Sequence, residues 1–176
     1  MKNLVTLLFA CLIALIVSCS SVYDVGYDYD QETNFAGLKT YDWLPVPEGI
    51  KVDTLVQERI KNAVNSGLEA KGLRMTSDTP DFLIAMQTMR KERESYAPQS
   101  SGYTYGPRWH GPRYSKYTYE EGTLVLDFVD PASKKLIWRG TAKGVVDSKM
   151  TPEKIDELVN EAVQKILKNF PPPAPK

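Results

Sequence analysis

The sequence predicts an α+β domain in which a mostly antiparallel sheet of about five strands carries two amphipathic helices on one face. Several short segments alternate apolar and polar residues with the period of a strand. Two longer segments repeat apolar residues at every third or fourth position, which is typical of an amphipathic helix. Each helix needs a surface on which to bury its apolar stripe, and one face of a sheet supplies it.

The N-terminal residues are typical of a bacterial lipoprotein signal. Lys2 precedes an apolar run of fourteen residues from Leu4 to Val17. This run is shorter than the roughly 20 apolar residues of a membrane-spanning helix, and it fits the apolar part of a cleaved secretory signal. The sequence Ile16-Val17-Ser18-Cys19 resembles the lipobox, in which branched apolar and small residues precede the cysteine that takes the lipid. We therefore predict a signal peptide over residues 1–18 and lipidation at Cys19; the alternatives are an ordinary signal peptide or a short anchor helix.

The composition of the chain narrows the possible functions. Lysine plus arginine and aspartate plus glutamate each number 22, so net charge does not favour binding to nucleic acid. Cys19 is the only cysteine after the predicted signal, and the mature chain therefore has no intrachain disulfide. Residues 19–170 suit a single domain, and a proline-rich tail follows over residues 171–176.

Three segments in the first half of the chain are strand candidates. Residues 20–31 alternate tyrosine or valine with aspartate or glycine, which favours an edge strand over a disordered spacer. Residues 39–44 form a second strand that ends at Pro45. Residues 82–89 are mostly apolar and indicate a buried strand. Because a helix connects residues 39–44 to residues 82–89, these two strands could be parallel through a right-handed crossover.

The first predicted helix covers residues 53–71. Its apolar residues recur at spacings of three and four. Asp53 or Thr54 has the side chain of an N-cap, and Gly72 suits the left-handed position that ends a helix.

The second half of the chain predicts a hairpin and the second helix. Residues 124–129 and 136–146 are two strands, and Asp130–Ser133 has the residues of a type I turn between them. Thr151 and Pro152 are typical of the cap and first position of a helix that ends before the proline-rich tail.

Residues 95–119 differ in character from the rest of the chain. Glycine, proline, serine and tyrosine dominate, and no apolar period is present, so we predict a long loop or hairpin extension. Tyrosine, tryptophan and arginine offer large contact area and planar hydrogen-bond donors, which suits a protein or glycan partner. The alternative is a loop that packs on its own sheet. The predicted partner-binding residues are Tyr103, Tyr105, Arg108, Trp109, Arg113 and Tyr114.

No set of residues indicates catalysis. His110 is the only histidine, and it lies inside the aromatic-rich segment. Asp24, Asp28 and Asp30 lack the spacing and terminal glutamate of a calcium loop. The mature chain cannot supply the cysteine and histidine ligands of a zinc site. We therefore predict no enzymatic activity, no metal site and no cofactor.

Two tryptophans lie in predicted strands. We expect Trp43 and Trp138 to pack in the core, with each indole N–H donating to a partner. Arg139 follows Trp138 and would point to the opposite face, where an acidic residue could pair with it.

Several short motifs together resemble the lipoprotein family called domain of unknown function 4136. In order along the chain they are Phe35, Lys39–Trp43, Lys71–Leu73, Pro80–Phe82, Glu121–Leu124, Asp130, Trp138–Gly140 and Phe170–Pro172. The resemblance covers nearly the whole mature chain and implies an envelope lipoprotein of α+β fold. It carries over no catalytic residue.

These observations favour a non-catalytic, lipid-anchored cell-envelope protein that binds an envelope protein or a glycan. The alternatives are an envelope hydrolase and a carrier of a small apolar ligand, which would show a large apolar cavity between sheet and helices. Ser20 follows Cys19 where aspartate would resemble an inner-membrane retention signal. We therefore expect the protein on the periplasmic face of the outer membrane.

Overall fold

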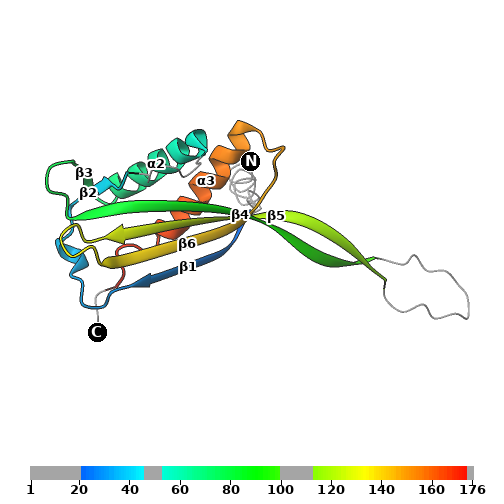
Figure 1. Cartoon of the computed structure of the whole chain (residues 1–176), viewed down its shortest axis with the longest axis horizontal. Coiled ribbons are helices and arrows are strands. Elements are labelled where there is room, and N and C mark those ends of the chain that lie inside the picture. Colours follow the sequence, from blue (N-terminus) through cyan, green and yellow to red (C-terminus); the bar gives the residue numbers. More distant parts are fainter. Residues whose placement is uncertain (1–20, 46–52, 100–112, 174–176) are drawn as a thin grey trace, which may run out of the picture.

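The computed structural model describes residues 21–45, 53–99 and 113–173 (Figure 1). Within these residues the chain forms one six-stranded sheet in the order β1-β6-β5-β4-β2-β3. Helices α2 (Thr54–Glu69) and α3 (Pro152–Leu167) lie against it, and a short 3-10 helix, η1, covers Phe35–Gly37. The predicted signal peptide and Cys19 lie outside the described residues.

The sheet is mixed, and the prediction of a mostly antiparallel sheet of about five strands was wrong in this respect. Neighbours β1/β6, β6/β5 and β5/β4 are antiparallel, whereas β4/β2 and β2/β3 are parallel. Helix α2 returns the chain to the end of the sheet where β2 began, which makes β2 and β4 parallel. The strands are β1 (Val22–Tyr29), β2 (Thr40–Trp43), β3 (Arg74–Met75), β4 (Phe82–Gln99), β5 (Arg113–Val129) and β6 (Leu136–Val146).

Side-chain caps fix where both helices begin. The Asp53 carboxylate accepts hydrogen bonds from the N–H groups of Leu55 and Val56, at 3.1 and 3.2 Å. The Thr151 hydroxyl accepts from the N–H of Lys154 at 3.4 Å, and Pro152 stands at the first helical position. These bonds satisfy donors that a helix N-terminus leaves without partners. Gly72 has φ +84°, as predicted for the residue that ends the first helix.

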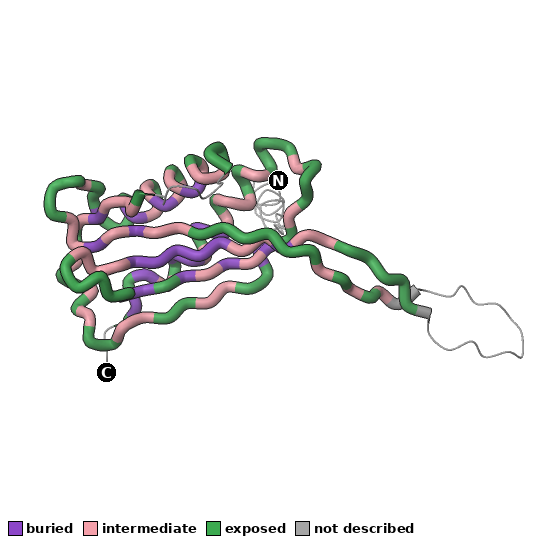
Figure 2. The backbone as a smooth tube through the Cα atoms, viewed as in Figure 1, coloured by how far each residue is buried: buried purple, intermediate pink, exposed green. Residues whose placement is uncertain are grey.

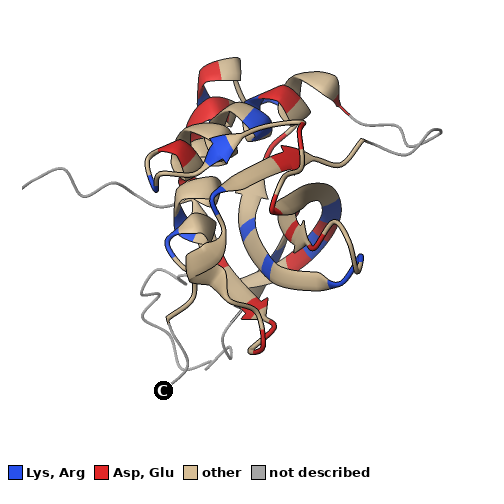
Figure 3. Ribbon diagram, turned by 90° about the vertical axis from the view of Figure 1, so that its left-hand side faces the viewer, with Lys and Arg blue, Asp and Glu red and all other residues tan. Residues whose placement is uncertain are grey.

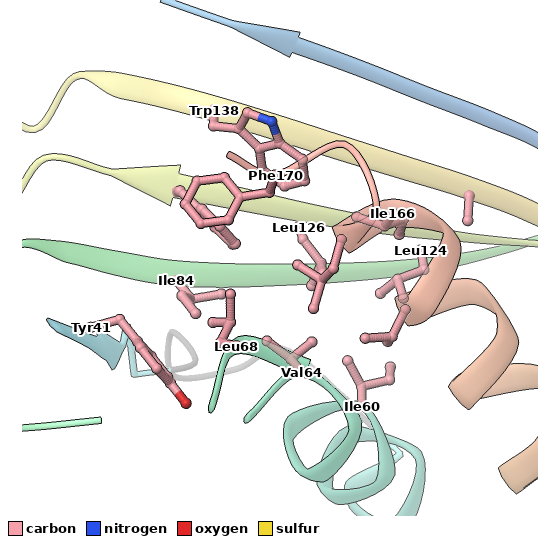
Figure 4. Close-up of a cluster of buried hydrophobic side chains, with 14 of the residues drawn as sticks. Tyr41, Ile60, Val64, Leu68, Ile84, Leu124, Leu126, Trp138, Ile166 and Phe170 are labelled. Carbon is pink, nitrogen blue, oxygen red and sulfur yellow. The ribbon is translucent and has the colours of Figure 1, made fainter. Parts of the chain in front are cut away.

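One hydrophobic core joins both helices to the sheet (Figures 2 and 4). Ile60, Val64 and Leu68 recur along α2 at spacings of four and are buried. They share the core with Ile166 of α3 and with Leu126 of β5. The predicted apolar period therefore corresponds to the buried faces of the helices.

A row of aromatic side chains crosses four neighbouring strands at one end of this core. Tyr41, Phe82, Phe128 and Trp138 come from β2, β4, β5 and β6, and their successive ring centroids lie 5.9, 4.9 and 4.7 Å apart. Phe170 lies on the row, 4.8 Å from Phe128 and 5.3 Å from Trp138. All five rings are buried, so this end of the sheet is closely packed.

The expectations for the two tryptophans were met unequally. The indole N–H of Trp43 donates to the Asn65 side-chain oxygen at 3.0 Å. Trp138 is fully buried, as predicted, but its indole nitrogen has no hydrogen-bond partner among the described residues. Arg139 pairs with Asp127 on the opposite face through two bonds of 2.6 Å, which confirms that prediction.

The segment predicted as a loop over residues 95–119 is strand at both of its ends. β4 runs to Gln99 and β5 begins at Arg113, and the two stay in register along this stretch. The alternative of a hairpin extension is therefore correct for residues 95–99 and 113–119. At the C-terminus, Pro171 and Pro173 are exposed and Pro172 is buried.

The aromatic row predicts a large effect of one truncation. Phe128→Ala should lower the free energy of unfolding by about 3–5 kcal/mol, because it leaves a cavity between three other buried rings. Leu55→Ala, at an exposed position in the first turn of α2, should change it by less than about 0.5 kcal/mol. Urea unfolding followed by circular dichroism measures both, and similar values for the two variants would contradict the packing described here.

Candidate functional site

The most prominent surface feature is a two-stranded arm, defined as residues 93–99 of β4 and 113–119 of β5. The pairs run from Arg93 opposite Tyr119 to Gln99 opposite Arg113. Pairing between β5 and β6 ends at Glu120, so among the described residues no third strand accompanies the arm. Seven residues per strand span about 20 Å at the rise of an extended chain. The arm thus projects well clear of the helices and the rest of the sheet (Figures 1 and 2).

Exposed tyrosines occupy both faces of the arm. Tyr96 and Tyr114 share one face and are 63% and 62% exposed. Tyr117, which is 50% exposed, lies on the other face beside Tyr119, with 6.2 Å between ring centroids. Tyrosines with half or more of their surface in water form the kind of amphipathic contact area that protein interfaces favour.

A charged cluster attaches the base of the arm to the edge strand β1. Arg93 donates to one Glu121 carboxylate oxygen through Nη2 at 2.8 Å and through Nε at 3.1 Å. The Tyr23 hydroxyl donates to the other oxygen. The hydrogen bond from Tyr23 contributes most, followed by those from Arg93, and together they hold the pKa of the Glu121 carboxyl below its usual range. Loss of water around the Tyr23 hydroxyl, together with the bond to Glu121, raises the pKa of Tyr23 to about 12. The tyrosine therefore remains a donor, and the glutamate an acceptor, at neutral pH.

The predicted partner-binding residues are only partly located by the structure. Tyr114 is exposed on the arm, and Arg113 begins β5, although its side chain is not described. Tyr103, Tyr105, Arg108 and Trp109 lie outside the described residues, as does His110. Sequence reasoning omitted Tyr96 and Tyr117 from the binding set, although Tyr117 and Tyr119 show the period of two that would have assigned them to a strand.

A cavity of about 430 Å³ lies between the two helices and strands β4, β5 and β6. Val56 and Ile60 of α2 and Ile155, Leu158 and Val159 of α3 supply much of its apolar wall. Its volume falls within the range of about 300–1,000 Å³ that is usual for small-molecule pockets. This is the feature that the alternative of an apolar-ligand carrier requires.

Small residues on the sheet create the space for this cavity. Gly122, Ala142 and Gly144 lie on neighbouring strands and line it, and Ala162 does so from α3. At Gly144 an added Cβ would lie 3.1 Å from the Ser21 carbonyl oxygen and 3.3 Å from Leu158. Larger side chains at these positions would fill the hollow or push the walls apart.

Two of the three aspartates Asp24, Asp28 and Asp30 pair with lysines. Asp24 pairs with Lys143 at 2.5 Å, and Asp30 with Lys135 at 2.9 Å. Acidic and basic residues are interspersed over the described elements (Figure 3). In residues 21–45, 53–99 and 113–173 no group of three or more histidine, cysteine, aspartate or glutamate side chains could hold a metal ion. No helix of the described chain is long and apolar enough to cross a bilayer.

The cluster at the base of the arm predicts a pH-dependent stability. Folding lowers the pKa of Glu121, so its stabilising contribution is present above the ordinary glutamate pKa of about 4.3 and is lost as the pH falls through the lower folded value. Glu121→Gln should therefore destabilise the protein at neutral pH, and the difference from wild type should shrink below about pH 4. The urea midpoints of Glu121→Gln and of the wild type, each measured at neutral pH and below about pH 4, give this difference. Glu94→Gln removes an ion pair to Lys116 in which both side chains are half exposed, and it should have little effect at either pH. A deficit of Glu121→Gln that does not change with pH would contradict the assigned role.

Three solved structures resemble the fold at low sequence identity. A PDZ domain protein from Parabacteroides distasonis matches with a TM-score of 0.58 and 14% identity, over 86% of this chain and 36% of that one. The chain thus spans about a third of that protein, and the likeness shows the fold alone. A PelC dodecamer from Paraburkholderia phytofirmans has a TM-score of 0.43 and 12% identity, over 82% and 94% of the two chains. A neuraminyllactose-binding hemagglutinin homolog from Helicobacter pylori has a TM-score of 0.40 and 16% identity, over 77% and 87%. The last two likenesses are too weak to carry an argument.

Sequence comparison assigns the family. No curated protein matches the chain. The model of one protein family matches residues 25–172, from within β1 to the buried Pro172. The match covers both helices and the sheet except for the first three residues of β1. The chain therefore belongs to the family described as Domain of unknown function (DUF4136).

Proposed function

We propose that this protein is a non-catalytic, lipid-anchored module of the cell envelope that binds a protein partner through its arm. The observation that carries the proposal is the two-stranded arm, which exposes Tyr96, Tyr114 and Tyr117 beyond the body of the domain. A two-stranded ribbon buries little of its own surface and is at best marginally stable alone in water. Its side chains are therefore free to bury area against another molecule.

The absence of catalysis is supported by how the acidic groups are used. Among the described residues, the carboxylates of Asp127 and Glu121 are buried, and each accepts two hydrogen bonds from one arginine. Carboxylates held in this way act as structural partners of cations. A general acid or base instead needs a proton-transfer group within reach of a substrate.

The anchor and the arm belong to the same end of the domain. Val22 at the start of β1 pairs with Gly144 of β6, and Gly144 pairs with Gly122 of β5. Gly122 also pairs with Arg90 of β4, which lies just before the arm. Cys19 precedes Val22 by three residues. A lipid on Cys19 would thus hold the base of the arm close to the membrane surface, and we propose a partner bound to that same membrane.

We propose that this membrane is the outer membrane, because Ser20 follows Cys19 where aspartate would resemble an inner-membrane retention signal. Sucrose-gradient fractionation of envelopes should show the protein with outer-membrane markers. Co-sedimentation with inner-membrane markers would contradict this location.

Lipidation makes a direct prediction about the mature N-terminus. Mass spectrometry should find Cys19 as the first residue, carrying acyl chains, and detergent should be needed to extract the protein, because stable anchoring takes at least two chains or signals. Cys19→Ser should abolish the modification and the membrane association. Cys11→Ser, inside the apolar run of the signal, is the matched control and should leave both unchanged. An unmodified N-terminus elsewhere would contradict the proposal.

Partner binding by the arm is tested by photo-crosslinking in intact cells. A photoreactive residue in place of Tyr117 should give a discrete protein adduct, whereas the same residue in place of Tyr27, exposed on β1 away from the arm, should not. With the label at position 117, the double variant Tyr96→Ser/Tyr114→Ser should lower the adduct yield by about tenfold or more, since interfacial aromatics contribute about 1 kcal/mol or more each. Equal adducts at positions 117 and 27 would argue against the arm. Adducts with phospholipid alone would assign the arm to the membrane surface instead of a protein.

A further inference from the structure

The first described residues of the chain form part of the wall of the cavity. Val22 lines it, and Ser21 precedes Val22. The Ser21 N–H donates to a Glu161 carboxylate oxygen at 3.2 Å, and the Lys165 ammonium donates to the Val22 carbonyl oxygen at 2.8 Å. Glu161 and Lys165 both belong to α3, whose residues 155, 158, 159 and 162 also line the cavity. The start of β1 is therefore held against the helix that forms one wall.

The lipidated position lies within reach of this cavity. Cys19 is two residues before Ser21, so the two Cα atoms are at most about 7 Å apart. One acyl chain is about 15 Å long, half of a hydrocarbon core of about 30 Å. A chain on Cys19 is thus long enough to reach the space that Val22 lines.

Much of the cavity wall suits a ligand that has no hydrogen-bonding groups. Val56, Ile155, Leu158 and Met150 supply apolar surface from the helices and from the loop before α3. The sheet contributes small residues such as Ala142, which leave the space empty of side chains. Polar side chains such as Asp53, Arg90 and Lys143 also line the cavity, so the aliphatic surface of the two helices is the part that suits an apolar chain. An acyl chain matches this apolar part of the wall.

We propose that one acyl chain of the lipid on Cys19 lies in this cavity, so that the domain encloses part of its own anchor. The proposal rests on the lipidation proposed above. Stable anchoring takes two chains or signals, so the lipid can place one chain in the cavity only if its other chains still hold the protein in the membrane. In this arrangement the anchor packs against the fold as well as holding it at the membrane.

The methionines of the chain allow a test without any substitution. The lipidated full chain is produced in cells that incorporate a diazirine analogue of methionine, irradiated in intact envelopes and digested. Met89 and Met150 line the cavity, whereas Met75 lies in β3 at the opposite edge of the sheet. Met89 and Met75 are each 54% exposed, so Met75 is a matched control for reaction with surrounding lipid.

Mass spectrometry of the digest reads two quantities independently. The mass of the N-terminal peptide reports whether Cys19 carries lipid. The adducts at each methionine report what lies beside it. We expect the N-terminal lipopeptide to be linked to Met150 or Met89 in several-fold excess over Met75. A lipidated N-terminus without this excess would overturn the cavity proposal and leave the anchor in place. An N-terminus without lipid would overturn both.

Two further outcomes bear on the source of the chain. Adducts of Met150 with free phospholipid, and none with the N-terminal peptide, would overturn the proposal and make the cavity a site for membrane lipid. Ala162→Leu should fill part of the cavity and lower the Met150 adduct several-fold, with lipidation and cooperative melting unchanged. Full adduct yield in a folded, lipidated Ala162→Leu protein would show that the chain lies elsewhere.

Discussion

Aromatic packing at one end of the sheet is the constraint on which the rest of the structure depends. Phe82, Phe128 and Trp138 stand on adjacent strands at centroid separations below 5 Å, and Phe170 closes over them after the end of α3. These large rings gain most from burial. Their contacts fix the register of β4, β5 and β6 and hold the C-terminal end of α3 to the sheet.

The opposite end of the sheet is built from small residues, and this contrast produces both candidate sites. Where the aromatic end has rings, the far end has Gly122, Ala142, Gly144 and Ala162, so that the helices and strands enclose a cavity. Beyond Glu120 the hairpin of β4 and β5 continues without a neighbour or a helix in the described chain. A strand without a covered face can expose tyrosines, because nothing there has to be buried.

The body of the fold could be predicted from sequence, and the sites only in part, for a physical reason. Burial imposes a pattern: the apolar stripe of residues 53–71, the caps at Asp53 and Thr151 and the strand at residues 136–146 all agree with the structure. The arm has no buried face, so the short alternation of Tyr117 and Tyr119 is not extended by other apolar residues, and residues 95–99 and 113–119 therefore resemble a loop. The two-residue β3 is exposed and leaves no pattern either. The cavity depends on small residues from separate strands that meet only in the folded chain.

The short distance between anchor and fold restricts what the arm can reach. If Cys19 carries the lipid, only two residues lie between it and Val22, and the two Cα atoms are at most about 10 Å apart. The arm extends about 20 Å from the same end of the sheet. An arm longer than the tether cannot point straight at the membrane without entering the headgroup region. It must lie along the membrane surface or be received by a molecule embedded there. With such an anchor, the geometry favours a partner in the plane of the same membrane over a distant one. The exposed tyrosines suit either arrangement, because their rings fit a surface that is apolar on one side and wet on the other.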